Sequence, residues 1–312
     1  MGSNDAADLV LALDLGGTNM RVAVVSSGGD ILARSETATP YDAGAEELAI
    51  LVAALCRQAA SDAGNVSPIG LGAAIPATFR PDGTVGKLPN LPRLSGSDIK
   101  GLLARETGLR VELMNDATAA AAGEHWLGAA AGAENAIMIT LGTGVGGGII
   151  LGGKVHFGAD GTAGEIGHLC VEPEGHQCGC GSRGCLEQYA SGTAVVRQAR
   201  ESGLIVSTAK DVYDLADRGD LAAGRLFLEM GRYLGIAIGG LLNVLDPDVV
   251  VIGGGVAAAW GRFYPAMRAE ATARAFPEPA ERAKIVRASL GDDPGVLGAA
   301  KITFERIAEG RL

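Results

Sequence analysis

The chain has 312 residues, 47% hydrophobic and 20% charged, so we expect a folded protein of two domains and not a disordered chain. A net charge of −10 and the lack of any Lys/Arg run argue against a nucleic-acid partner. Acidic residues interrupt the apolar stretches at the N-terminus and at 234–255, so we expect no secretion signal, no membrane span and a cytoplasmic protein. In that compartment, clustered cysteines bind metal or act catalytically sooner than they form disulfides.

The first forty residues predict three strands joined by glycine turns, and the alternation in the third strand suggests one exposed face. Helix-period and strand-like segments follow in turn. The expected elements are strands at 9–15, 21–27 and 31–39, a helix at 45–63, a strand at 68–77, a helix near 97–107 and a strand at 110–114.

Residues 135–155 repeat the arrangement at the start of the chain: apolar strand, Gly/Thr turn, apolar strand, Gly-Gly turn and a further strand. A third apolar strand at 248–260 runs into a triple glycine and a helix. Two such units could be a chance similarity of glycine turns. The repeat favours instead an internally duplicated α/β protein with a cleft between its halves.

Two familiar nucleotide motifs fit the second glycine turn poorly. Residues 142–147 match G-x-G-x-x-G, but a strand follows where a dinucleotide-binding fold requires a helix, which excludes an NAD-dependent dehydrogenase. Residues 148–155 approach a P-loop, but Val155 stands where Ser or Thr must bind Mg²⁺. Neither motif therefore identifies the ligand.

The two Gly/Thr turns taken together suggest phosphate binding. Backbone N–H groups of such turns can receive phosphate oxygens, and Thr18 and Thr143 can add hydroxyl groups. Each turn alone is better explained as an ordinary hairpin. As a pair, with Asp14 next to the first turn, they favour the phosphates of a nucleotide.

Asp116 lies where a strand ends and an alanine-rich helix begins. One interpretation is a helix cap made by Asn115 or Asp116. However, ligands in α/β folds bind at the carboxyl ends of strands. A carboxylate there can accept a hydroxyl proton as the oxygen attacks phosphorus.

Three cysteines and one histidine form a set that suits zinc. A Cys₃His group is a tetrahedral zinc ligand set, and the intervening glycines let the loop wrap a metal. A disulfide across C-x-C would be strained, and a C-x-x-C redox motif is absent. His176 and Cys170 are weaker substitute ligands. The expected ligands are His168, Cys178, Cys180 and Cys185.

Glu165 and Glu187 flank this cluster in sequence. A closed structural zinc would fix a loop that presents both carboxylates toward a common space. Carboxylates beside a histidine suit hydrogen bonding to several hydroxyl groups, as in a sugar. Glu187 alone could equally be a surface residue.

These segments together resemble the ROK family of sugar kinases, most closely its bacterial glucokinases. They occur in family order from about residue 9 to residue 300, and the spaced set from Glu165 to Glu187 is their most specific part. "DLGGT" alone is shared with many actin-like ATPases. The matching segments are "LDLGGTNMRVAV", "LPNLP", "MNDATAAAAGE", "LGTGVGGGII", "GTAGEIGH", "CGCGSRGCLEQYASG" and "VVVIGGGVA".

The resemblance implies a duplicated actin-like, ribonuclease H-like α/β fold whose two domains close on a sugar and ATP with Mg²⁺. We expect a small domain of residues 1–117 plus 295–312, and a large domain of 118–294 that carries the zinc loop. The family also suggests a homodimer. Its members transfer the ATP γ-phosphoryl group to a primary sugar hydroxyl, with Asp116 as the implied general base.

The resemblance assigns further roles by position. The implied sugar-binding residues are Asn90, Asn115, Asp116, Glu165, His168 and Glu187. The implied phosphate-binding residues are Gly16, Gly17 and Thr18 in the first turn and Gly142, Thr143 and Gly144 in the second. Gly254 and Gly255 would lie near the adenosine, Asp14 would position Mg²⁺ through water, and His168 would also ligate the structural Zn²⁺.

Alternatives remain within the family. Some members are transcriptional repressors with an N-terminal helix-turn-helix module, for which the eight residues before Leu9 are too few. An actin-like filament or chaperone ATPase would have no use for a zinc loop beside two glutamates. Glucose is the expected substrate, with N-acetylglucosamine, N-acetylmannosamine, fructose or allose as alternatives, and polyphosphate as an alternative donor.

Overall fold

The computed structural model describes residues 8–80, 83–86, 88 and 91–312, which form two compact α/β units. Unit 1 comprises the described part of Met1–Ala131 together with Phe157–Ala163 and Leu290–Leu312. Unit 2 comprises Gly132–His156 and Gly164–Ser289. The expected boundaries, after residues 117 and 294, differ from this division.

The difference comes from one helix pair. Helix α3 (Asp116–Leu127) packs along α10 (Pro294–Ala308), and both lie in unit 1. Glycines allow this close approach, since a Cβ atom on Gly123 would overlap the carbonyl of Pro294, and one on Gly298 would overlap the carbonyl of Ala119. The first unit therefore extends past α3 to Ala131.

The sheet of unit 1 has the strand order β3-β2-β1-β4-β5. β1 pairs antiparallel with β2 and parallel with β4, so the glycine turn between β1 and β2 is a hairpin. β2 pairs antiparallel with β3, and β4 parallel with β5. The strands are β1 (Leu9–Leu15), β2 (Asn19–Ser26), β3 (Ile31–Ala38), β4 (Leu71–Ile75) and β5 (Val111–Asn115).

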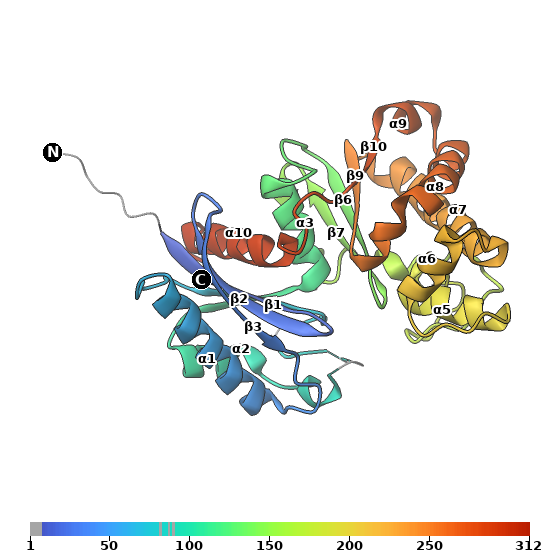
Figure 1. Ribbon diagram of the computed structural model, residues 1–312. Helices are drawn as coiled ribbons and strands as arrows, with labels where there is room; N and C mark the ends of the chain where they lie inside the picture. Colours follow the sequence, from blue (N-terminus) through green and yellow to red (C-terminus); the bar gives the residue numbers. More distant parts are fainter. Residues whose placement is uncertain (1–7, 81–82, 87, 89–90) are drawn as a thin grey trace. The chain divides into compact units, whose positions relative to one another are not determined.

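Helices cover both faces of this sheet (Figure 1). On one face lie α1 (Ala45–Asp62) and α2 (Ile99–Thr107), and on the other face lie α3 and α10. α1 is amphipathic and buries a stripe of apolar residues against β2 and β3. The parallel strands β1, β4 and β5 thus end at one edge of a covered sheet.

The sheet of unit 2 repeats that of unit 1, with the order β10-β9-β6-β7-β8. β6 pairs antiparallel with β7 and parallel with β9, as β1 does with β2 and β4. The outer pairs, β7 with β8 and β9 with β10, also keep the directions found in unit 1. The expected duplication is confirmed. The strands are β6 (Ala136–Leu141), β7 (Val145–Leu151), β8 (Lys154–Val155), β9 (Val249–Gly253) and β10 (Lys284–Arg287).

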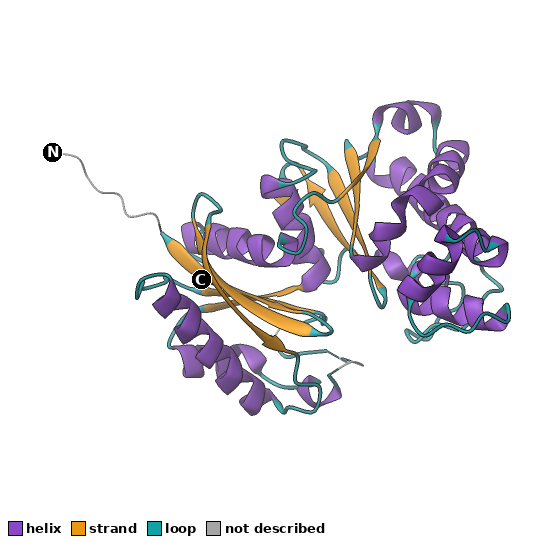
Figure 2. Cartoon of the chain, viewed as in Figure 1, coloured by secondary structure: helices purple, strands orange, loops and turns teal. Residues whose placement is uncertain are grey.

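Helices of unit 2 gather on one side of its sheet (Figure 2). α7 and α8 pack along each other and, with β6 and β9, enclose the apolar core of the unit. Within the described residues, no helix is long and apolar enough to cross a membrane. The helices are α4 (Glu187–Ala190), α5 (Gly192–Glu201), α6 (Ala209–Asp217), α7 (Leu221–Leu245), α8 (Trp260–Arg274) and α9 (Pro277–Arg282).

Candidate active site

The first glycine turn lies at the end of β1. The Gly16 N–H donates to the Asn19 carbonyl at 3.0 Å, and a Cβ atom on Gly16 would lie only 2.8 Å from that oxygen. Thr39 supports the turn twice, because its N–H donates to the Thr18 carbonyl at 2.8 Å and its hydroxyl to the Gly16 carbonyl at 2.7 Å. Gly17 and Thr18 are exposed, so the tip of the turn is accessible to a phosphate.

Asp14 precedes this turn in a poorly solvated position. The pKa of its carboxyl is raised from 3.8 to about 6, mainly by burial and also by the negative charge of Asp116, while Arg21 acts to lower it. A Cβ atom on Gly295, at the start of α10, would lie 3.0 Å from both carboxylate oxygens. Two acidic side chains therefore influence each other at the edge where the parallel strands end.

The structure assigns the helix cap of α3 to Asn115. Its Oδ1 atom accepts hydrogen bonds from the N–H groups of Ala117 at 2.9 Å and Thr118 at 3.1 Å. Asp116 is the first helical residue, and its Oδ1 also accepts the Ala117 N–H at 2.9 Å, so it contributes to the same helix start. The Oδ1 of Asn115 is occupied by the cap, and its Nδ2 lies 3.4 Å from the Ala77 carbonyl. Asn90 lies outside the described residues.

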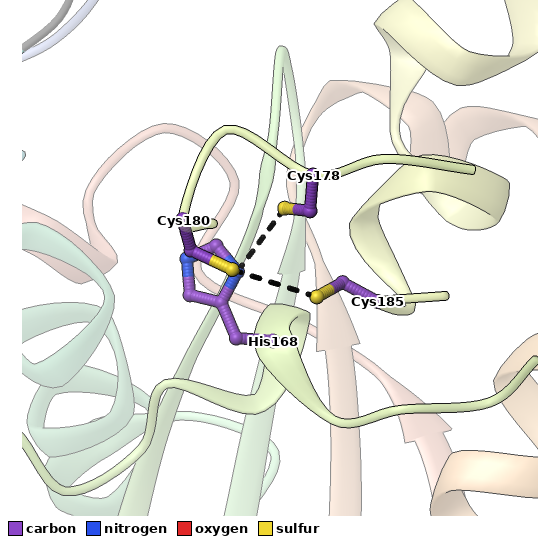
Figure 3. A group of neighbouring side chains, drawn as sticks. All are labelled: His168, Cys178, Cys180 and Cys185. Atoms are coloured by element: carbon purple, nitrogen blue, oxygen red, sulfur yellow. Dashed lines mark hydrogen bonds between the residues drawn. The ribbon is translucent and has the colours of Figure 1, made fainter. Parts of the chain in front are cut away.

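The predicted metal ligands converge in unit 2 (Figure 3). The four donor atoms lie within 4.8 Å of one another. Cys178 Sγ is 3.6 Å from His168 Nδ1, and Cys180 Sγ is 3.6 Å from Cys185 Sγ. Zn–S bonds of about 2.3 Å in a tetrahedron place sulfur atoms about 3.8 Å apart. The spacing thus fits a zinc ion, whereas a disulfide needs about 2.05 Å between sulfurs.

The two weaker alternatives for the metal lie outside this group of donors. Cys170 joins the loop through its backbone, by a bridge to Cys185, and its exposed thiol is not among the four convergent donors. The ring of His176 lies 5.5 Å from the ring of Tyr189. The Cys₃His set is therefore the one that the described residues bring together.

His168 presents its two ring nitrogens to different neighbours. Nδ1 faces Cys178, while Nε2 lies 3.9 Å from Oε2 of Glu165. The imidazole is 37% exposed and the Glu165 side chain 45%, so both remain within reach of a polar ligand. The geometry allows His168 to ligate a metal on one side and to face hydroxyl groups on the other.

Glu187 is not an isolated surface residue. It opens α4 two residues after the buried Cys185, and its Oε2 accepts the N–H of Val145 at 3.1 Å. A Cβ atom on Gly144 would overlap the same oxygen. The carboxylate of Glu187 thus packs against the second glycine turn.

The second turn has the same internal hydrogen bond pattern as a tight hairpin. The Gly142 N–H donates to the Gly144 carbonyl at 3.0 Å. Donors from the start of α5 then hold the outer side of the turn. The Gly192 N–H donates to the Gly142 carbonyl at 2.8 Å, and the Thr193 hydroxyl to the Thr143 carbonyl at 2.8 Å.

A cavity of about 990 Å³ in unit 2 begins at this turn. Its size is at the upper end for small-molecule sites, and its wall combines the turn with the apolar surfaces of α5, α6 and the 3₁₀ turn Gly255–Ala259. Residues that line it include Thr143, Thr193, Val196, Tyr213, Gly255 and Val256.

Gly254 and Gly255 differ in what they do. Gly255 lines the cavity. Gly254 has φ of +83°, and a Cβ atom there would lie 2.5 Å from the carbonyl oxygen of Leu141. Gly254 therefore permits β9 to end tightly against β6, while its neighbour is accessible to a ligand.

Sequence reasoning missed several residues that the structure brings to these sites. Val196 and Tyr213 come from two amphipathic helices whose strong periodicity was the available signal. Val145 acts through its backbone N–H, which donates to Glu187. Thr39 acts through its hydroxyl, which donates to the carbonyl of Gly16, 23 positions earlier. Neither contact leaves a signal in the sequence.

Two matching sheets, each with a glycine turn after its first strand, define the actin-like ATPase class of folds. The chain belongs to the ROK family, whose profile matches residues 10–306. The family assignment agrees with the resemblance carried by the motifs.

Curated relatives and solved structures cover nearly the whole chain. A glucokinase from Halalkalibacterium halodurans is 38% identical over 92% of each chain, and an N-acetylmannosamine kinase from Yersinia pestis is 36% identical over 93% of this chain and 96% of its own. The ROK hexokinase of Thermus thermophilus superimposes with a TM-score of 0.86 at 37% identity, over 97% of this chain and 100% of its own. A glucokinase from Streptomyces griseus, in complex with glucose and AMPPNP, gives 0.79 at 31%, over 94% and 98%. The chain is a sugar kinase of this family.

Proposed function

We propose that the protein transfers the γ-phosphoryl group of ATP to the 6-hydroxyl of glucose. The observation that carries the proposal is the position of Asp116, an acid directly after the parallel strand β5, whose charge acts on Asp14 next to the first glycine turn. The glucose and AMPPNP complex of the Streptomyces griseus relative supports the same pair of substrates.

In this proposal Asp116 accepts the proton of the attacking hydroxyl. Phosphoryl transfer depends on alignment and charge neutralisation, and a general base contributes about 10²–10⁴-fold. Bound Mg²⁺ supplies positive charge against the phosphate oxygens. Asp14 is the residue that would hold it through water, and the pKa of Asp14 is raised first by burial and then by the negative charge of Asp116, both of which a nearby cation would offset. The two glycine turns bind the phosphates.

The sugar is bound by side chains that the zinc loop orders. The carboxylates of Glu165 and Glu187 accept hydrogen bonds from hydroxyl groups. The Nε2 side of His168, the Nδ2 group of Asn115 and the amide of Asn90 complete the set. Zinc held by His168 and the three cysteines supplies no chemistry to the transfer and fixes the loop. The adenosine occupies the 990 Å³ cavity beside Gly255.

A second hexose is the main competitor for glucose. The N-acetylmannosamine kinase relative matches this chain nearly as well as the glucokinase does, at 36% against 38% identity. N-acetylglucosamine, fructose and allose remain further alternatives, and polyphosphate an alternative donor. All of these would use Asp116 in the same role.

The test is release of ADP in a coupled assay with ATP, Mg²⁺ and each of these sugars. We expect turnover to be highest with glucose, with about one zinc per chain in the same sample. Asp116→Asn should lower kcat by about 10²–10⁴-fold and leave the zinc content unchanged. Asp62→Asn, on the exposed end of α1, is the matched control and should behave as wild type.

The outcomes separate the levels of the proposal. Highest turnover on an N-acetylated sugar would keep the mechanism and change the substrate. An Asp116→Asn variant with full kcat would remove the general base from the proposal. No turnover with any sugar or donor would overturn the kinase function itself.

A further inference from the structure

We infer that residues 185–193, called here the clamp segment, hold the second glycine turn in its phosphate-binding shape, and that Glu187 is a positioning residue for the nucleotide. The inference rests on the proposed function, because it takes the turn to bind ATP. It gives Glu187, and the metal-binding loop that precedes it in sequence, a role in binding ATP as well as the sugar.

The first contact of the clamp is made by a side chain. Oε2 of Glu187 accepts the N–H of Val145, which is a buried residue at the start of β7. The same oxygen lies where a side chain on Gly144 would be. A buried N–H that loses its acceptor retains its full desolvation penalty, so this hydrogen bond favours one conformation of the turn.

The second contact comes from the other end of the segment. The Gly192 N–H and the Thr193 hydroxyl donate to the carbonyls of Gly142 and Thr143, each at 2.8 Å. These carbonyls face the clamp. Each of the four turn residues 142–145 is thus contacted by the clamp segment, the first two by its end and the last two by Glu187.

The clamp segment is tied directly to the metal-binding loop. It begins at Cys185, a buried metal donor two residues before Glu187. The hydroxyl of Tyr189 accepts the His176 N–H at 2.9 Å, and the Tyr189 ring lies 4.1 Å from the ring of Tyr233 on α7. Ordering the loop by a metal therefore orders the support of the phosphate turn as well.

A carboxylate has two oxygens, and this gives the clamp a functional consequence. With Oε2 of Glu187 on Val145, Oε1 is left for a sugar hydroxyl. A sugar that immobilises Glu187 also immobilises the acceptor of the Val145 N–H. Sugar and nucleotide should therefore bind with positive coupling, each raising the affinity for the other by the same factor.

The experiment measures binding of AMPPNP with Mg²⁺ to the zinc-loaded chain of 312 residues in the absence of sugar, by titration calorimetry. Glu187→Ala removes the acceptor and should raise Kd by about tenfold. Glu187→Gln retains an oxygen that can accept the Val145 N–H, so its Kd should stay within about twofold of wild type. In the kinase assay, Gln should raise KM for the sugar alone, and Ala should raise KM for both substrates.

Glu165→Ala is the matched control, because Glu165 also lies beside the metal-binding loop but contacts His168 and not the turn. This variant should bind the sugar more weakly and leave the Kd of AMPPNP unchanged. If Glu187→Ala binds AMPPNP as wild type does, or if Glu165→Ala weakens it equally, the inference is wrong.

Two further results distinguish a failure of the clamp from a failure to fold and from a failure of the proposed kinase function. If Glu187→Ala loses zinc or fails to fold, Thr193→Val decides, with an expected rise in Kd of about threefold, and an unchanged Kd would overturn the clamp. A protein with no turnover on any sugar but with the predicted pattern of AMPPNP affinities would refute the proposed function and keep the clamp.

Discussion

The two glycine turns have the same place in the two sheets, but different parts of the chain hold them. In unit 1 the supporting donor is Thr39, the residue that follows β3 of the same sheet. In unit 2 the donors and the acceptor come from Gly192, Thr193 and Glu187, which follow the metal-binding loop. One turn depends on its own sheet, and the other on an irregular segment.

This difference separates two ways of building a phosphate site. The first turn is in place whenever the β1–β2 hairpin and β3 are folded, because its support, Thr39, directly follows the last ladder pair, Asn19 with Ala38. The second turn is in place only when the loop of residues 168–186 is ordered, and that loop has little regular structure of its own. We therefore expect metal removal to affect the second turn and to spare the first.

The largest expected effect comes from Cys185→Ser. Structural zinc in peptides contributes about 10–16 kcal/mol of binding free energy, and Cys185 is a fully buried donor. We expect the variant to lose its zinc and to show faster amide exchange at residues 142–145 and 168–190. Amides of residues 16–18 should exchange as in wild type.

Cys170→Ser is the matched control, since it changes a thiol of the same loop that lies outside the four donors. It should keep about one zinc per chain and the wild-type exchange pattern. Equal loss of protection in both turns after Cys185→Ser would contradict the separation drawn above.

The next effect concerns the acid beside the first turn. A pKa of about 6 for Asp14 in the folded protein, against 3.8 in the unfolded chain, corresponds to about 3 kcal/mol of destabilisation above pH 6, which vanishes below pH 4. The sign follows because the folded state binds the proton more tightly, so stability falls as the pH rises. Asp14→Asn should therefore raise the free energy of unfolding by up to about 3 kcal/mol at pH 8, without added Mg²⁺.

Denaturant unfolding between pH 4 and pH 8 measures this effect. The gain from Asp14→Asn should shrink as the pH falls through 6, and the exposed Asp62→Asn should show no such trend. Added Mg²⁺ should reduce the gain if Asp14 helps to hold the metal. A gain that is the same at every pH would show that the charge of Asp14 is not destabilising.

The sequence predicted the features that depend on short-range patterns. Apolar runs ending in glycine placed β1 and β6, and the repeat revealed the duplication. The metal donors were predictable because all four lie in one stretch, 168–185, rich in glycine. The kinase class followed from the same motifs, through resemblance and not through physics.

Other features depend on packing that no local pattern encodes. The boundary after Ala131 is set by α3, an alanine-rich helix with no strong apolar stripe to show which sheet it covers. Asn115 and Asp116 are equally good caps by residue type, and only the fold shows that Asn115 is the N-cap while Asp116 is the first helical residue and shares the Ala117 N–H. The contact of Glu187 with Val145 spans 42 positions, so its support of the turn required the structure.

The smallest predicted effect compares the two turns directly, through Thr39→Val and Thr193→Val. Each change removes one hydroxyl donor from a turn carbonyl and keeps the shape of the side chain. Thr39 is only 5% exposed, so water cannot replace its hydroxyl, and we expect a loss of about 1–2 kcal/mol in the free energy of unfolding. Thr193 is exposed, so water can replace its hydroxyl, and the loss should stay below about 0.5 kcal/mol.

Ligand affinity should follow the opposite order in these two variants. Thr193→Val leaves the fold intact but loosens the second turn, and should weaken AMPPNP by about threefold. In Thr39→Val the β1–β2 hairpin still holds the first turn through the Gly16–Asn19 hydrogen bond, so once folded the protein should bind AMPPNP within about twofold of wild type. Only a turn that is held from outside its sheet can lose affinity for the ligand without a loss of protein stability. Equal losses of stability in the two variants would therefore mean that the second turn is built into its sheet as firmly as the first.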